Sequence, residues 1–169
     1  SNGRTVGMLG RLGKFATLYS KKALAGYNLS TVEEWIYLLR LYMLDNPKKS
    51  ELIYGLISEF PSGSEIIKRL KRKGFVSEYI DPSDRRSKRL KISGKGKKLL
   101  RDSMPKMEIV GEMALNRLNE DEKIVLDYLL NKLDAFHTRN YKKVHKASFK
   151  EAYSTILEDL DKSSEGSTR

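Results

Sequence analysis

The chain has 169 residues, enough for one domain of ordinary size with added helices but too few for two large domains. Hydrophobic residues make up 39% and charged residues 33%, which excludes a collagen-like or mainly disordered chain. The chain contains no cysteine, so disulfides, thiolate zinc sites and cysteine nucleophiles are excluded. No apolar run approaches the ~18 residues of a membrane-spanning helix, and no signal-peptide pattern is present, so we expect a cytoplasmic protein.

The first half of the chain predicts four helices. Apolar residues at three-to-four spacing predict a helix over residues 4–25. Ser30 precedes Glu33 by three residues, a capping-box pattern that predicts a second, centrally packed helix running to residue 43. Asn46, followed by Pro47, is expected to cap a short third helix. The sequence over residues 60–63 predicts a break, after which a fourth helix runs from about residue 62 and ends at Gly74.

After Gly74 the apolar period changes from about 3.6 to 2, which predicts a strand. Residues 81–84, Asp-Pro-Ser-Asp, have turn chemistry, and residues 89–92 alternate again as a returning strand. Arg85 and Arg86 are expected at the tip of this hairpin. The remaining residues predict helices over 94–118, with a bend at Pro105, and over 119–136, followed by one further amphipathic segment over 141–160 and a frayed end from residue 163.

Positive charge is concentrated in one part of the chain. The formal net charge is +11, and residues 65–101 contain 14 basic and 4 acidic side chains. A generic run of charge is usually only a solvated surface, but here the charge follows a helix pair and then a hairpin. That order of elements is typical of a winged helix-turn-helix, so the position of the charge favours nucleic-acid binding.

Residues 64–100 contain two distinctive stretches. One is Ser-Glu-Ile-Ile-Lys-Arg-Leu-Lys-Arg-Lys-Gly-Phe-Val at 64–76, and the other is Asp-Pro-Ser-Asp-Arg-Arg at 81–86, followed by Leu-Lys-Ile-Ser-Gly-Lys-Gly at 90–96. With these stretches, residues 64–100 resemble the MarR family of bacterial transcriptional regulators. The resemblance extends more loosely over residues 4–138, and residues 139–169 have no clear counterpart. The implied fold is mainly α with a small β-hairpin wing (α+β), a winged helix-turn-helix flanked by terminal dimerisation helices.

The resemblance also implies a domain organisation. Residues 4–30 would form an N-terminal dimerisation helix, and residues 31–100 the DNA-binding domain, with a recognition helix at about 62–73 and the wing at about 75–92. Residues 101–138 would form C-terminal dimerisation helices, and residues 139–169 an additional helical or partly disordered tail. Such a homodimer would bind palindromic double-stranded DNA, with the recognition helix in the major groove and an Arg-bearing wing in the minor groove.

Two sets of site residues follow from the resemblance. The first is expected to contact DNA and comprises Ser62, Ser64, Glu65, Lys68, Arg69, Lys71, Lys73, Asp84, Arg85, Arg86 and Lys88. Within it, Asp84 would pair with Arg86, and Glu65 departs from relatives that carry arginine at this position. The second is expected to line a pocket for a small aromatic or phenolic effector and comprises Tyr19, Tyr27, Trp35 and Tyr54.

Other functions have little support in the sequence. His137 and His145, the only histidines, are about 12 Å apart if they lie on one helix, too far for one metal ion. We therefore expect neither a metal site nor a cofactor, and no enzymatic activity. Membrane binding is not expected, because the basic residues lie on a hairpin rather than on a helix with a broad apolar face. The alternative is a winged-helix scaffold that binds protein or RNA without reading a DNA sequence.

Overall fold

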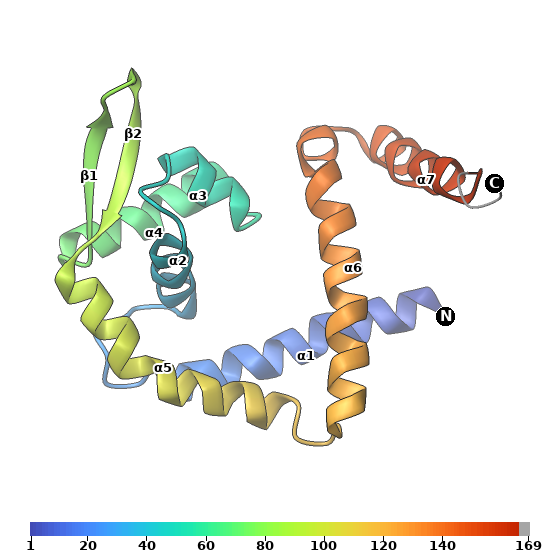
Figure 1. The fold of residues 1–169 in the computed structure, drawn as a ribbon, viewed down its shortest axis with the longest axis horizontal. Coiled ribbons are helices and arrows are strands. Elements are labelled where there is room, and N and C mark those ends of the chain that lie inside the picture. The colour runs from blue at the N-terminus through green and yellow to red at the C-terminus, as the bar shows by residue number, and fades with distance from the viewer. Residues whose placement is uncertain (166–169) are drawn as a thin grey trace. The chain divides into compact units, whose positions relative to one another are not determined.

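The computed structural model describes residues 1–165, with side chains through residue 157. The chain divides into two compact units, residues 1–116 and 117–169, and Figure 1 labels their elements. The first unit contains α1 (Asn2–Ala23), α2 (Val32–Met43), α3 (Lys49–Gly55), α4 (Phe60–Arg72), β1 (Val76–Asp81), β2 (Asp84–Ile92) and α5 (Gly94–Ala114). The second contains α6 (Glu120–Val144) and α7 (Phe149–Glu165). This architecture confirms the predicted fold class.

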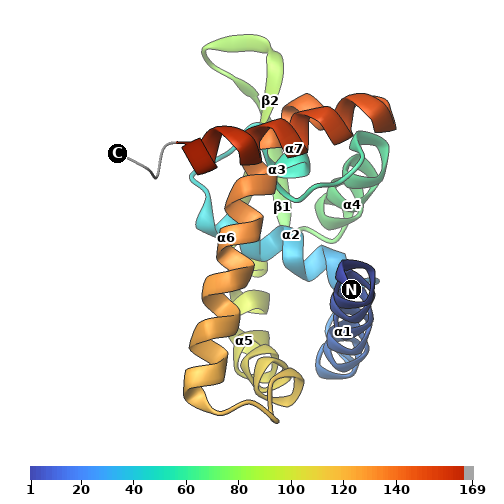
Figure 2. The ribbon, with the colours of Figure 1, turned by 90° about the vertical axis from the view of Figure 1, so that its right-hand side faces the viewer.

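The hairpin is the only sheet within the described residues, and it projects from the helices around it (Figure 2). Its strands are antiparallel, and Val76 pairs with Ile92 at the base. The predicted cap at Asn46 is wrong. Pro47 and Lys48 instead lie along β2, where Leu90 N–H donates to Pro47 O and Lys48 forms a bridge with Arg89, so Lys48 is extended and α3 begins only at Lys49.

Two other helix starts also differ from the prediction. The residue that caps α2 is Thr31, one position later than expected: its hydroxyl accepts from Glu34 N–H, while the Glu34 carboxylate accepts from Ser30 N–H. The start of α4 is at Phe60, so Pro61 lies in the first turn rather than in a break. A proline is tolerated there because the first backbone N–H groups of a helix have no partner within the helix.

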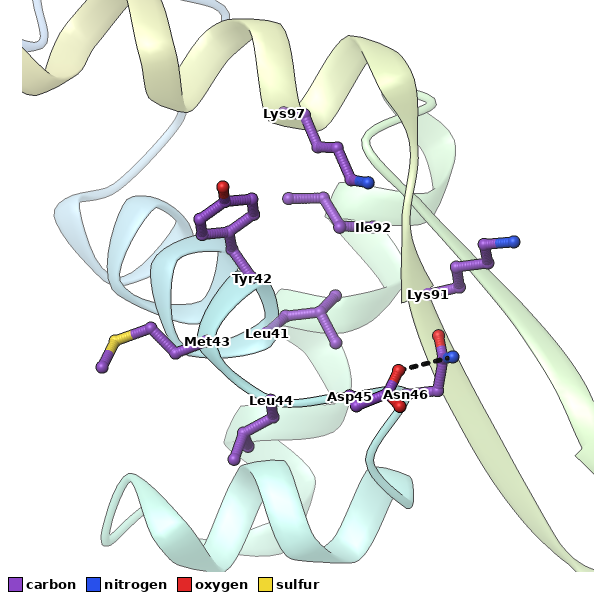
Figure 3. Close-up of a pocket in the computed structure, with 9 residues that line it drawn as sticks. All are labelled: Leu41, Tyr42, Met43, Leu44, Asp45, Asn46, Lys91, Ile92 and Lys97. Carbon is purple, nitrogen blue, oxygen red and sulfur yellow. Dashed lines mark hydrogen bonds between the residues drawn. The ribbon is translucent and has the colours of Figure 1, made fainter.

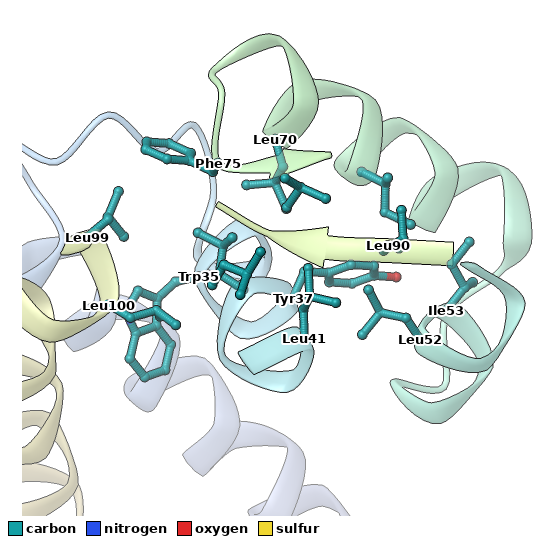
Figure 4. Packing of buried hydrophobic residues seen from close by; sticks show 14 of the residues in the cluster. Trp35, Tyr37, Leu41, Leu52, Ile53, Leu70, Phe75, Leu90, Leu99 and Leu100 are labelled. Atoms are coloured by element: carbon teal, nitrogen blue, oxygen red, sulfur yellow. The ribbon is translucent and has the colours of Figure 1, made fainter. Parts of the chain in front are cut away.

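The core of the first unit forms around α2, as the sequence predicts (Figure 4). Leu38 of α2, Ile53 of α3 and Leu90 of β2 are fully buried. The indole N–H of Trp35 donates to the buried Ser103 hydroxyl at 2.8 Å, which connects α2 to α5. Burial of these side chains fixes α3, α4 and the base of the wing on one helix.

The junction between β2 and α5 explains part of the sequence motif at 90–96. The Ser93 hydroxyl accepts from Gly96 N–H and caps α5. A Cβ atom on Gly96 would lie 2.5 Å from the Phe75 carbonyl oxygen, closer than any real contact. Ser93 is therefore used as a helix cap, and Gly96 is required by the close packing of the base of the wing on α5.

The second unit is helical. Asn119 and Glu122 form the predicted capping box at the start of α6. The segment predicted to be amphipathic over residues 141–160 is divided between the end of α6 and α7, which contacts α6. The frayed end predicted from residue 163 is wrong for residues 163–165, which belong to α7, and residues 166–169 lie outside the described residues. Across the helices that the structure describes, none is long and apolar enough to span a membrane.

Candidate nucleic-acid interface

The outer face of α4 presents several of the residues predicted to contact DNA. Ser62, Glu65 and Lys68 are exposed, and Ser64 is half-buried. Lys68 forms only a loose ion pair with Glu65, at 3.8 Å between Nζ and Oε1. Arg72 is exposed and has no ion-pair or hydrogen-bond partner among the described residues, so it joins this face although it was not among the predicted contacts. The sequence places it in the same basic run.

Two of the other predicted contacts, Arg69 and Lys73, point their charged groups into the fold. Arg69 Nε lies 2.7 Å from Glu34 Oε1, and Lys73 Nζ lies 2.7 Å from Glu34 Oε2 and 2.8 Å from the Ser30 hydroxyl. Glu34 belongs to α2 and is fully buried. Burial alone would raise the pKa of Glu34, but the hydrogen bonds from Lys73, Arg69 and Ser30 N–H outweigh it and hold the pKa below its usual value.

A second carboxylate, Glu78 of β1, bridges α4 and the wing. Its Oε1 lies 3.0 Å from Lys71 Nζ and 3.2 Å from Lys88 Nζ. Its pKa is lowered because the hydrogen bonds from the two lysines outweigh the effect of burial. The lysines themselves are exposed, so their side chains remain at the surface while one carboxylate offsets part of their charge.

The tip of the wing carries two arginines without internal partners. The turn consists of Pro82 and Ser83, and the register changes so that residues 85–87 are additional on the β2 side. Arg85 and Arg86 are exposed, and their guanidinium groups have no hydrogen bond or ion pair within the described residues. The expected pairing of Asp84 with Arg86 takes a different form, because Asp84 accepts from the backbone N–H of Arg86 at 3.1 Å.

Two aspartates fix the backbone around this tip. Asp84 also accepts from the Ser87 hydroxyl at 2.6 Å, and these two hydrogen bonds lower its pKa. Asp81, which is buried, accepts from the Ser83 N–H and hydroxyl and from Arg89 Nε, and these contacts lower its pKa too. Arg89 in turn donates to the carbonyl of residue 46. The tip therefore has a defined backbone and free arginine side chains.

The residues predicted to line an effector pocket do not form one cluster. Tyr27 lines a hollow of about 340 Å³ between the end of α1 and the start of α2, together with Lys21, Leu29 and Thr31, and its hydroxyl donates to Asp102 O. Tyr19, Trp35 and Tyr54 do not line this hollow. Trp35 is buried, Tyr19 stacks on Phe15 within α1, and Tyr54 packs against Phe60.

A second hollow, which the sequence did not predict, lies where the end of α2 meets β2 and α5 (Figure 3). Its volume is about 290 Å³, and Tyr42, Met43 and Ile92 contribute to its walls. Lys91 and Lys97 also line it, and Figure 3 shows the Lys97 ammonium near Ile92, whereas the Lys91 ammonium points away from the other lining side chains. The sequence signal for such a hollow is weak, because its walls come from three separate elements.

Comparison with known proteins gives both sequence relatives and structural neighbours. No protein-family model matches the chain. Over 85 residues, or 50% of its length, the chain is 29% identical to the HTH-type transcriptional repressor NicR of Pseudomonas putida and covers 54% of that protein. The chain thus spans little more than half the length of the curated relatives it matches, 54% and 61%.

Solved structures match a larger part of the chain. Bordetella bronchiseptica BpsR, described with regulation of its DNA binding by 6-hydroxynicotinic acid, superposes with a TM-score of 0.72 at 20% identity, covering 78% of this chain and 98% of BpsR. A variant of Escherichia coli MarR complexed with operator DNA gives a TM-score of 0.69 at 20% identity, covering 78% of this chain and 91% of that one.

The arrangement of α3, α4 and the β1–β2 hairpin on α2 defines a winged helix-turn-helix protein. A crystal structure of MarR superposes on the chain with a TM-score of 0.73 at 20% identity, covering 81% of this chain and 92% of that one. The chain therefore has the MarR fold, as the sequence resemblance predicted.

Proposed function

We propose that this protein is a DNA-binding transcriptional regulator that acts as a homodimer on palindromic duplex DNA. In this proposal α4 enters the major groove, and Arg85 and Arg86 of the wing reach the minor groove. The observation that carries the proposal is the wing tip, where two arginines stand on a fixed backbone without any internal partner among the described residues. A narrow minor groove is strongly negative and supplies the compensation that these guanidinium groups lack within the fold.

The residues proposed to contact DNA are those whose polar groups face outward. On α4 and the wing they are Ser62, Ser64, Glu65, Lys68, Lys71, Arg72, Arg85, Arg86 and Lys88. Asp84 supports the tip through its hydrogen bond to the Arg86 backbone. Arg69 and Lys73 are left out of the proposed contact because their charged groups bind Glu34.

The proposed homodimer rests on uncovered apolar surface. In the first unit this surface includes Val6, Leu12 and Ile109, with exposed fractions of 67%, 52% and 53%. In the second unit Ile124 and Leu133 of α6 are 67% and 49% exposed. A monomer rarely leaves so many large apolar side chains in water, and a second copy would bury them. Sedimentation equilibrium at micromolar concentration should show twice 19.4 kDa, and a monomer alone would contradict the proposal.

A small aromatic acid is the ligand class we propose as an effector. The hollow beside Tyr27 supports this, because it combines an aromatic wall with the cation of Lys21. BpsR, which shares the fold, is described with such a ligand. Titration with a panel of hydroxylated aromatic carboxylates should weaken DNA binding by the parent protein, and replacement of Lys21 by methionine should remove the response.

Selection of bound sequences from random duplex DNA with the purified protein tests the central proposal. We expect a palindromic preference whose half-sites are separated by about one helical turn. Binding without a sequence preference, or preferential binding to RNA, would instead support the scaffold function. Replacement of both Arg85 and Arg86 by alanine should flatten the preference at the outer flank of each half-site.

A further inference from the structure

The buried carboxylate of Glu34 connects α2 to the C-terminal half of α4. The carboxylate accepts three hydrogen bonds, from Arg69 of α4, from Lys73 at the C-cap of α4 and from Ser30 N–H. Glu34 itself is 0% exposed, whereas the side chains of Arg69 and Lys73 are 27% and 18% exposed. The two cations thus lie at the edge of the proposed DNA-binding face but direct their charge inward.

Loss of the donors around Glu34 would cost free energy of folding. A buried carboxylate without partners would bear a large desolvation penalty, and Glu34 avoids it only through these donors. Arg69 and Lys73 also share one carboxylate on a different helix, so the contact fixes the distance and angle between α2 and α4. Loss of the carboxylate would release two cations and remove one constraint on the helix at the same time.

We propose that Glu34 is a positioning residue that determines sequence discrimination, because it withholds Arg69 and Lys73 from DNA phosphates and holds α4 at its docking angle. This inference rests on the proposed DNA-binding function. Phosphate contacts add affinity for every sequence equally, whereas base contacts require a fixed helix. With Glu34 in place, affinity depends more on base-edge contacts from α4 and less on sequence-independent charge.

The substitution Glu34→Gln tests this proposal, because it retains the size of the side chain and removes its charge. Binding to the selected palindrome and to a scrambled duplex is measured as a function of salt. On scrambled DNA the slope of log K against log salt should steepen by up to about 3.6 per dimer, from four released cations at about 0.9 each. The ratio of specific to scrambled affinity should fall by about tenfold or more, since bidentate base contacts contribute discrimination of that order.

Glu51→Gln is the matched control. Glu51 is an exposed carboxylate that accepts from Lys48 N–H at the start of α3, so its replacement makes the same change in net charge without releasing Arg69 or Lys73. Its slope and its discrimination ratio should equal those of the parent. A steeper slope in both variants would mean that net charge alone is responsible, and the proposal would be overturned.

Lys73→Gln and Lys68→Gln provide a test that does not depend on the folding of the Glu34 variant. Lys68 is exposed at the proposed interface, so its loss should reduce the slope by about 1.8 per dimer, whereas loss of Lys73 should leave the slope unchanged. Equal reductions would show that Lys73 contacts phosphate and would overturn the inference. A parent protein that does not discriminate between the two duplexes would instead contradict the proposed function itself.

Discussion

Arginine and lysine serve different purposes in two neighbouring regions of the first unit. At the C-terminal end of α4, Arg69 and the C-cap residue Lys73 bind the buried Glu34. At the tip of the wing, Arg85 and Arg86 follow one another in sequence, and no described residue offers either guanidinium a carboxylate. Both regions contribute to the same basic segment, yet of these four cations only Arg85 and Arg86 present their charge to solvent without a partner among the described residues.

The difference shows that the net charge of a segment overestimates its capacity to bind an anion. A cation that is neutralised by a buried carboxylate contributes to helix placement, and its release would expose that carboxylate without partners. A cation on a rigid turn with no partner gains most of its interaction energy from the ligand. We therefore expect DNA binding by α4 to depend on the placement of the helix, and DNA binding by the wing to depend on its unpaired charge.

The largest expected effect comes from displacing α4. A Cβ atom on Gly63, in the first turn of α4, would lie 2.6 Å from the Tyr37 hydroxyl and 2.7 Å from Ile53. Gly63→Ala should therefore lower the free energy of unfolding by about 1–3 kcal/mol through overpacking and should also reduce DNA affinity. Urea titration measures the first effect and fluorescence anisotropy with labelled DNA the second. Gly55→Ala is the control, because no atom lies within 4 Å of its Cβ position, and it should leave both unchanged.

A substitution at the tip of the wing should reduce DNA binding without lowering the free energy of unfolding. Arg86→Ala should cost roughly 1–3 kcal/mol on the selected site, as expected for one specific groove contact, and should flatten the preference at the A·T-rich flank. The urea midpoint should stay at the parent value because the Arg86 side chain has no internal partner among the described residues. A variant that lost stability together with affinity would remove the distinction between the two regions.

Acid should weaken the α2–α4 connection in particular. The pKa of Glu34 lies below its usual value of 4.5, so the carboxylate stabilises the fold fully above that value and loses this contribution as the pH falls through its folded pKa. Between about pH 6 and pH 3, the free energy of unfolding should therefore fall more for the parent than for Glu34→Gln. Glu78, Asp81 and Asp84 also have lowered pKa values but are present in both proteins, so the difference reports on Glu34. Parallel curves would contradict the assignment.

The smallest effect is expected from Asp84→Ala. This substitution removes the hydrogen bonds that Asp84 accepts from the Arg86 N–H and the Ser87 hydroxyl, so the tip would have to be ordered on docking. DNA affinity should fall several-fold even though a negative charge has been removed. Simple electrostatics predicts the opposite sign, so tighter binding at matched salt would show that Asp84 does not preorganise the tip.

Local sequence patterns are sufficient to predict most elements of this fold. The change of period after Gly74, the Asp-Pro turn and the Asn119–Glu122 box each lie within a few residues, and the structure contains the hairpin and the α6 cap they predict. One error arose where a distant segment intervened. Asn46 does not cap α3, because residues 46–48 pair with β2, more than 40 residues further along the chain.

The sequence by itself therefore determined the order of elements, the wing and the concentration of positive charge over residues 65–101. Only the tertiary structure decided which of those cations are free. Glu34 stands 35 residues before Arg69 and 39 before Lys73, and it meets them only because α2 packs against α4. Helix caps and turns depend on neighbours in the chain, whereas the strength of an ion pair depends on burial and on a distance set by packing.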